Sequence, residues 1–254
     1  MLKRAWCSND LQELIDRVRA SSEKVGLLIN TDKTKVMTCG NNGMNTRISL
    51  SGEVLEEVES FVYLGSIFNS DGSCTQDVRK RLAMGRSAMQ SLSSIWKSKD
   101  ISTTTKVRLL KALVWSVATY GSEGWTLRSK EEKYIEAFEM WCYRRLLRVP
   151  WTQHKTNEWI LCKLKVDREL LDRVKSLKLG YYGHTSRKYE SLEKQMVQGC
   201  IPGYSNRGRQ RRRWTDDITE WTGMKINEAK AAAEDRDRWR EILRAANLSY
   251  GRRH

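Results

Sequence analysis

The chain has 254 residues, and its 46 Lys and Arg residues against 31 Asp and Glu residues give a net charge of +15. That length allows one large domain or two small ones with real cores, and neither a bilayer-spanning apolar run nor a signal peptide behind the basic start at 1–4 is expected. The six cysteines are scattered without a C-x-x-C pair, so we expect reduced thiols in an intracellular protein rather than a disulfide framework or a zinc ribbon.

The first 70 residues are predicted to form a helix and a small sheet. An apolar stripe at Leu11, Leu14, Ile15, Val18 and Val25 predicts a helix over 9–25, capped by Asn9 and ended by Gly26. Strands are predicted at 27–30, 34–39, 47–50 and 60–68, with turn residues at 40–43 and 51–52 between them. These elements indicate a mostly antiparallel sheet with a helix on one face.

Helical periodicity predominates after residue 70. Apolar steps of three and four predict helices near 78–96, 105–120, 129–149, 170–181, 215–222 and 226–246. Ser129 and Glu132 are predicted to form a capping box, and Pro150 to end that helix. The predicted class is α+β, mainly α, with parts at 1–70, 71–195, a Gly- and Arg-rich linker at 196–214, and a C-terminal helical hairpin at 215–254.

The basic charge is concentrated in the later part of the chain. Residues 1–100 carry 14 bases and 12 acids, whereas residues 101–200 carry 19 and 11. A field of this sign attracts polyanions, and the ten Trp and nine Tyr residues offer faces on which bases stack. RNA, DNA or both are therefore the expected partners, with no membrane; the alternative is a generically basic protein. The oligomeric state is not predicted.

An arginine run gives this charge a specific place. The segment RGRQRRRW supplies possible contacts to phosphates and bases at Arg207, Arg209, Arg211, Arg212, Arg213 and Trp214. A nuclear-import signal, with nuclear localisation, or a solvated linker are the alternatives. Cys142, Cys162, His184 and Cys200 are too widely spaced for typical zinc ligands, so no metal site is predicted.

Six motifs, taken in order, resemble one protein family. They are GLLINTDKTKVM (26–37), SFVYLGSIFNSDGSC (60–74), YGSEGWTL (120–127), FEMWCYRRLLRVPWT (138–152), GYYGH (180–184) and RGRQRRRWTDDITEW (207–221). Together they resemble the C-terminal half of a non-LTR retrotransposon endonuclease–reverse transcriptase of the RTE/BovB-like group, an RNA-directed DNA polymerase, from about residue 10 to about 247. The resemblance implies a palm remnant over 1–70 and a thumb-like helical region over 71–195.

The resemblance implies roles for three groups of residues. Asn30, Lys33 and Lys35 match the palm motif near the incoming triphosphate, where a lysine neutralises phosphate charge or protonates pyrophosphate. Phe61, Tyr63, Leu64 and Gly65 match the primer grip, and Lys106, Arg108 and Lys111 line a thumb helix facing template–primer phosphates. The alternatives are solvated lysines at a hairpin corner, an ordinary buried strand, and a solvated helix face.

The metal-binding half of a polymerase site is not found where the family has it. The family places an aromatic-x-Asp-Asp turn just before the helix at 9–25, where this sequence reads MLKRAWCSND. WTDD at 214–217 instead matches a helix start, with Thr215 as cap and Asp216 and Asp217 in the first turn. No catalytic residue is assigned, and Mg²⁺ is expected only in the full-length enzyme.

The expectation is thus a 5′-truncated fragment that binds nucleic acid but does not polymerise alone. The alternative is a host-retained, non-enzymatic nucleic-acid-binding or interaction protein.

Overall fold

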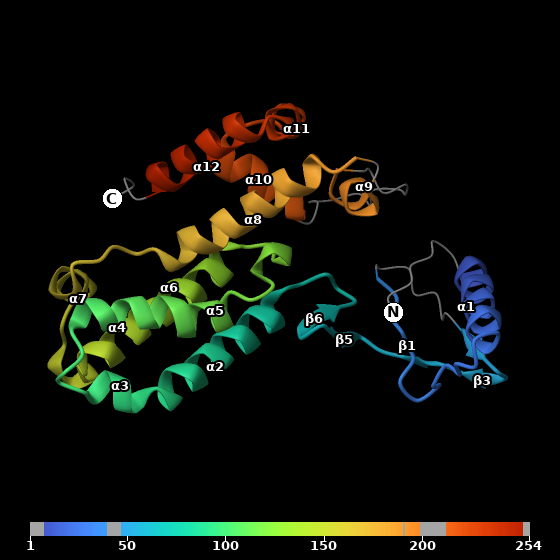
Figure 1. Cartoon of the computed structure of the whole chain (residues 1–254), viewed down its shortest axis with the longest axis horizontal. Coiled ribbons are helices and arrows are strands. Elements are labelled where there is room, and N and C mark those ends of the chain that lie inside the picture. The colour runs from blue at the N-terminus through green and yellow to red at the C-terminus, as the bar shows by residue number, and fades with distance from the viewer. Residues whose placement is uncertain (1–7, 40–46, 190, 199–211, 251–254) are drawn as a thin grey trace. The chain divides into compact units, whose positions relative to one another are not determined.

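The computed structural model describes residues 8–39, 47–189, 191–198 and 212–250 (Figure 1). The chain divides into two compact units, residues 1–74 and residues 75–254. Helices predominate and the strands are short. The predicted α+β, mainly α class is therefore confirmed.

In the residues described, the N-terminal unit contains one helix and six short strands. These are α1 (Ser8–Glu23), β1 (Lys35–Val36), β2 (Ser49–Leu50), β3 (Glu53–Val54), β4 (Glu56–Glu57), β5 (Ser60–Tyr63) and β6 (Ser66–Asn69). They form three two-stranded sheets, and β1 pairs with β4 in parallel whereas β2–β3 and β5–β6 are antiparallel. The strand pairs are mostly antiparallel, as predicted, but they form three separate sheets in the residues described instead of the single predicted sheet, because residues 27–30 form no strand and residues 60–68 fold back as a hairpin.

A small apolar core holds α1 against the second sheet. Leu11 and Ile15 of α1 pack with buried Val36, Ile48 and Leu50, and Leu55 completes the core. The Gln12 amide reinforces this packing, since it donates to Ser49 O at 2.8 Å and accepts from Ser49 N at 2.9 Å. One side chain thus pairs with a strand backbone as a neighbouring strand would.

Two details of the α1 prediction were wrong. Asn9 lies inside the helix, which already includes Ser8, so Asn9 is not its N-cap. Val25 is 70% exposed instead of joining the buried stripe, because it follows the last helical residue, Glu23, and no longer keeps the helical phase. Gly26 adopts φ +75°, the left-handed conformation that commonly ends a helix.

The C-terminal unit is helical in the residues described. It contains α2 (Thr75–Ser91), α3 (Ser93–Lys97), α4 (Thr103–Leu109), π-helical η1 (Leu110–Val114), α5 (Trp115–Ala118), 3₁₀ turn η2 (Ser122–Gly124), α6 (Ser129–Leu147), 3₁₀ turn η3 (Trp151–Gln153), α7 (Asn157–Leu164), α8 (Leu170–Ser186), α9 (Leu192–Gln198), α10 (Trp214–Thr222), α11 (Ile226–Glu234) and α12 (Arg236–Tyr250). The capping box of α6 is formed by Arg128 and Glu131, not by Ser129 and Glu132 as predicted. Ser129 is already the first helical residue, so the N-cap is the residue before it, and Arg128 N donates to Glu131 Oε2 at 3.2 Å.

The first part of this unit is built around α2, α5 and α6. Gly85 of α2 lies so close to Phe138 of α6 that an added Cβ would be 2.7 Å from the ring. Trp115 and Tyr143 are also buried, with ring centroids 6.4 Å apart. The absence of a side chain at residue 85 therefore sets how closely α2 and α6 approach.

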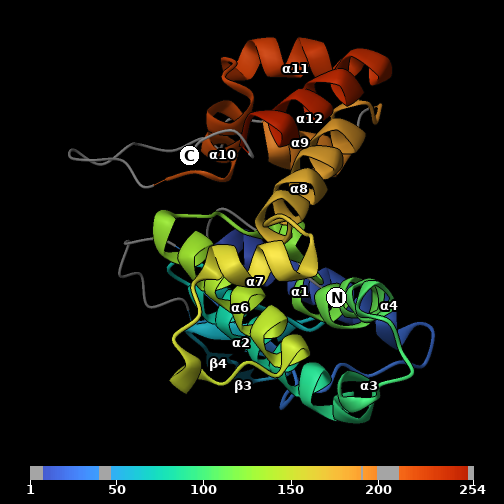
Figure 2. The same cartoon turned by 90° about the vertical axis from the view of Figure 1, so that its left-hand side faces the viewer.

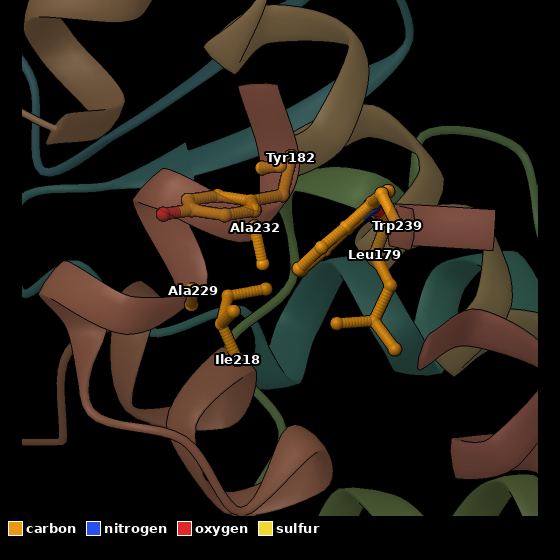
Figure 3. Close-up of a cluster of buried hydrophobic side chains, with 7 residues drawn as sticks. Leu179, Tyr182, Ile218, Ala229, Ala232 and Trp239 are labelled. Atoms are coloured by element: carbon orange, nitrogen blue, oxygen red, sulfur yellow. The ribbon is translucent and has the colours of Figure 1, made fainter. Parts of the chain in front are cut away.

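The second part packs α10, α11 and α12 along α8 (Figure 1). Figure 3 shows the Trp239 indole beside Leu179 and Tyr182 of α8, with Ile218, Ala229 and Ala232 completing the buried cluster. The Trp239 Nε1–H donates to Leu179 O at 2.9 Å, so the buried indole also satisfies its polar atom. The segment predicted as a two-helix hairpin contains three helices in the residues described, because the helix predicted over 226–246 is interrupted at the extended residue Asp235. These helices pack on α8 around Trp239.

Candidate nucleic-acid interface

At the turn formed by residues 30–35, Lys33 is exposed to solvent and Lys35 is in an ion pair. Asn30 Oδ1 accepts a hydrogen bond from Lys33 N at 2.9 Å, and Asn30 O accepts one from the Thr34 hydroxyl at 2.7 Å. Asn30 therefore fixes the turn from which Lys33 extends, exposed. Lys35 instead forms an ion pair with Glu56 across the β1–β4 ladder. Lys33 is therefore the more accessible of the two cations, whereas the charge of Lys35 is paired with a carboxylate.

The hairpin that matches the primer grip ends in a strained turn. Leu64 has φ +49° and Gly65 φ +84°, so both central residues occupy the left-handed region, as a type I′ turn requires. Phe61 and Tyr63 are half-buried on the same side of β5, in alternation with exposed neighbours. Leu64 is 75% exposed at the tip, so it is not a buried strand residue.

The three cations of the α4–η1 segment have different environments. Lys106 is buried, and its Nζ donates to Trp96 O at 3.1 Å and Ser98 O at 2.6 Å, which caps the end of α3. Lys111 lies in the π-helical turn and pairs with Glu169. Arg108 is exposed. Of the three, Arg108 is the cation whose placement suits contact with a phosphate without breaking an interaction that holds helices together.

Two of the five arginines of the run, Arg212 and Arg213, fall within the described structure. Arg207, Arg209 and Arg211 lie outside the described residues. Arg212 Nε donates to Asp217 Oδ1 at 2.7 Å and its Nη2 lies 2.6 Å from Glu220 Oε2, which raises the Arg212 pKa despite its partial burial. Arg213 is exposed at the N-cap of α10. The Arg213 side chain is therefore accessible to solvent, whereas Arg212 is paired with two carboxylates of α10.

The Trp214 side chain packs against other residues of the C-terminal unit. Its Nε1–H donates to Glu123 O at 2.8 Å, and its ring meets Tyr181 at 6.2 Å between centroids. The Lys178 Nζ also lies 4.5 Å from the ring centroid. These contacts occupy the indole with intramolecular partners, so stacking of a base on Trp214 requires displacing them.

The WTDD string forms a helix start and a buried ion pair. Arg213, not Thr215, is the N-cap of α10, because the helix begins at Trp214; Arg213 N donates to Asp216 Oδ2 at 2.7 Å. Asp217 is completely buried, and its Oδ2 lies 2.5 Å from Lys178 Nζ. Asp216 and Asp217 are therefore both engaged in the fold.

One buried carboxyl group was missed from the sequence. Glu139 of α6 accepts hydrogen bonds from Glu169 N at 2.9 Å and Leu170 N at 3.0 Å, and so caps α8 from another helix. Desolvation raises its pKa from 4.5 to about 7 in spite of these bonds. Its position in an apolar helical stripe was the available signal, because a glutamate there must find polar partners.

A concentration of exposed basic and tryptophan side chains where α6 ends and α7 begins was also missed, although FEMWCYRRLLRVPWT was among the motifs.

The described residues include no cluster of three or more His, Cys, Asp or Glu side chains that could hold a metal ion. Within the same ranges, no helix combines the length and apolar character needed to cross a bilayer.

Comparison with known proteins finds a similarity to a transposon-derived protein. It is 27% identical over 260 residues to a transposon-derived protein of Caenorhabditis elegans, and the match covers 93% of this chain and 88% of the relative. No protein-family model matches the chain, and no solved structure does. The similarity to this relative supports a transposon origin for the chain.

Proposed function

We propose that this chain derives from the C-terminal part of a non-LTR retrotransposon reverse transcriptase of the RTE/BovB-like group, and that it binds RNA or DNA without extending a primer by itself. The ordered motifs and the transposon-derived relative support the derivation. The charge supports the binding activity, because the excess of bases falls in the C-terminal unit, where Arg108, Arg145, Lys155 and Arg213 are exposed.

The proposal that the chain does not extend a primer by itself is supported by the environment of Asp217. Asp216 and Asp217 form the one Asp-Asp pair in the sequence. A polymerase needs such carboxylates to hold divalent cations. Here the Asp217 oxygens accept from Lys178, Arg212 and Leu127 N, and Asp216 accepts from Arg213 N. Oxygens already neutralised by two cations do not fit a Mg²⁺ site, so no nucleotidyl-transfer step is assigned to them.

Salt-dependent binding of the full chain to labelled single-stranded and duplex oligonucleotides tests the binding activity. We expect the logarithm of the affinity to fall linearly with the logarithm of the salt concentration. The variant Arg207→Gln/Arg209→Gln/Arg211→Gln/Arg213→Gln should lower that slope by roughly 0.7 for each lost contact to a single strand. Lys130→Gln/Lys133→Gln, which changes exposed cations at the start of α6, is the control for loss of charge alone.

Primer extension tests the missing activity. Purified chain, an annealed template–primer and nucleotides with Mg²⁺ or Mn²⁺ should give no longer product. Template-dependent extension by the purified wild-type chain would overturn this half of the proposal. A wild-type chain with no salt-dependent affinity for RNA or DNA would overturn the other half.

A further inference from the structure

The surface where α6 ends and α7 begins, residues 144–165, is here termed the α6–α7 corner (Figure 2). Its basic side chains are Arg144, Arg145, Arg148, Lys155, Lys163 and Lys165, and its one acidic residue is Glu158. Except for Arg144, all of these bases are exposed. Such an imbalance within so short a segment creates a local positive field that attracts a polyanion.

Two indoles and an imidazole lie within this field. Trp151 is 83% exposed, and its ring meets His154 edge-on at 5.8 Å between centroids. Trp159 is 41% exposed, with Lys155 Nζ 5.1 Å from its ring centroid. A tryptophan is usually largely buried because its apolar surface is the largest of any side chain. An indole left as open as Trp151 therefore contributes little to the fold and remains available to a partner.

The scaffold beneath these side chains is well held. Arg144 Nη2 donates to Lys155 O at 2.8 Å and to Asn157 Oδ1 at 2.9 Å, so one guanidinium ties the loop to α6. Thr156 caps α7 by accepting from Trp159 N at 3.2 Å, and Ile160 anchors α7 in the core. The two indoles are therefore presented from an ordered loop and a packed helix, which reduces the entropy lost when a ligand binds.

A further cation reaches the corner from α3. Arg148 Nη2 donates to Lys97 O at 3.2 Å, and the Lys97 side chain is exposed. Arg148 itself occupies the left-handed region at φ +57°, as do His154 at +45° and Lys165 at +55°. Glycine takes this conformation without the roughly 1 kcal/mol that other residues lose. At three turns where glycine would be less strained, the chain thus carries a basic or imidazole side chain.

We infer that the α6–α7 corner is a binding site for single-stranded nucleic acid. Trp151 and Trp159 stack on unpaired bases, and Arg145, Arg148 and Lys155 bind the flanking phosphates. Stacking on an indole requires a base whose face is free, which a duplex does not offer away from its ends. This inference rests on the proposed nucleic-acid-binding function and gives it a location distinct from the arginine run at 207–213.

The site is tested by measuring how wild-type and variant full-length chains bind fluorescein-labelled oligo(dT) and oligo(U) of about 12 nucleotides. A duplex of the same length is measured alongside them. Trp151→Ala and Trp159→Ala should each weaken single-strand binding at least about fivefold. Trp151→Phe, which keeps an aromatic face, should recover most of the loss. Tyr189→Ala, at another exposed aromatic residue, should leave affinity unchanged. Thermal unfolding of each variant verifies that the fold is retained.

The outcomes separate this site from the general function. Wild-type binding that neither tryptophan variant weakens would overturn the site and leave the proposed function intact, whereas absence of wild-type binding to any oligonucleotide would defeat both. Equal losses for duplex and single strand would overturn the stacking role. Loss of affinity for phosphatidylserine vesicles with unchanged oligonucleotide affinity would identify an anionic membrane surface as the partner and overturn the inference.

Discussion

Lys178 and Asp217 form an ion pair that is entirely removed from solvent, between α8 and α10. Asp217 Oδ2 also accepts from Leu127 N at 3.0 Å, and Lys178 Nζ donates to Trp125 O at 2.7 Å. These bonds connect the segment before α6, the middle of α8 and the start of α10. Two charges in such a place are tolerated because each satisfies the other together with nearby backbone groups.

Replacing Asp217 with Asn should therefore destabilise the chain by about 3–5 kcal/mol, because Lys178 would remain buried without its counter-charge. Chemical denaturation followed by circular dichroism measures the loss. Adding Lys178→Met to the same chain should recover much of the stability, because the amide oxygen of Asn still accepts from Leu127 N while the buried cation is gone. An Asp217→Asn chain as stable as wild type would show that the pair does not hold α10 on α8.

The GYYGH motif contains two glycines that should respond in opposite directions to alanine. At Gly183 an added Cβ would lie 2.3 Å from the Trp239 ring, which is itself buried, so Gly183→Ala should cost about 2–3 kcal/mol. At Gly180 nothing lies within 4 Å of the added atom. Because glycine weakens a helix interior, Gly180→Ala should raise the free energy of unfolding by about 0.5–1 kcal/mol.

Thermal unfolding of the two variants side by side gives the comparison. Each adds one methyl group to α8, so the difference in melting temperature reports the close approach of Trp239 to Gly183. Destabilisation of similar size at both positions would show that α8 tolerates neither change for reasons unrelated to Trp239.

The longer helices of the C-terminal unit were predictable because each buries one apolar stripe, and a stripe is a local property of sequence. The short helices α7 and α9 were not predicted, because seven or eight residues give too few turns for a clear stripe. The first residues of the predicted helices were harder to predict. At the N-caps Arg128 and Arg213 it is the backbone N–H that donates, to Glu131 and Asp216, so these positions do not need a typical capping side chain. The strands were overestimated at 27–30, because an apolar run does not specify a pairing partner.

The site was less predictable than the fold. Lys106 has the sequence pattern of a solvated helix face, yet it turns inward to carbonyl groups at the end of α3. Asp217 depends on Lys178 and Leu127, which are 39 and 90 residues away in the chain. Such partners are set by the packing of helices, and no local pattern encodes them. Exposure of Trp151 is likewise a tertiary property.

Glu139 should make stability fall as pH rises. Its carboxyl pKa is raised to about 7 in the folded chain by desolvation, so the folded state retains a proton that the unfolded state releases near pH 4.5. The free energy of unfolding should therefore decrease between about pH 4.5 and 7, by about 1.4 kcal/mol per pH unit at most, and level off above. Below the unfolded pKa both states are protonated, and the slope vanishes.

The variant Glu139→Gln should flatten this part of the pH profile, because its amide has no proton to release in the range. Denaturation midpoints from pH 4 to 8 measure the slope, whatever constant offset the amide introduces. A smaller slope of the same sign should remain from Asp172, whose pKa burial raises to about 6. An unchanged slope in Glu139→Gln would exclude Glu139 as its source.

Arg212 and Arg213 should separate stability from binding. Arg212 pairs with Asp217 and Glu220, so Arg212→Gln should lower the melting temperature. Arg213 is exposed, so Arg213→Gln should keep the melting temperature and weaken oligonucleotide binding, with a lower salt slope. Melting curves and binding isotherms of both single variants decide between the roles. Binding loss confined to Arg212→Gln would reverse the assignment.

The turn at the tip of the β5–β6 hairpin should be stabilised by replacing its leucine. Leu64 occupies a left-handed conformation that asparagine adopts with less strain, and Asn-Gly is a favoured type I′ pair. Because the Leu64 side chain is largely exposed, Leu64→Asn should slow hydrogen exchange of the β5–β6 amides by about 1 kcal/mol of opening free energy. Gly65→Ala, which places a side chain at φ +84°, should accelerate the same exchange.

If Leu64 contacts a primer strand, as the family resemblance implies, Leu64→Asn should also weaken template–primer binding while the hairpin becomes more stable. A more stable hairpin with unchanged affinity would leave the tip without a role in binding.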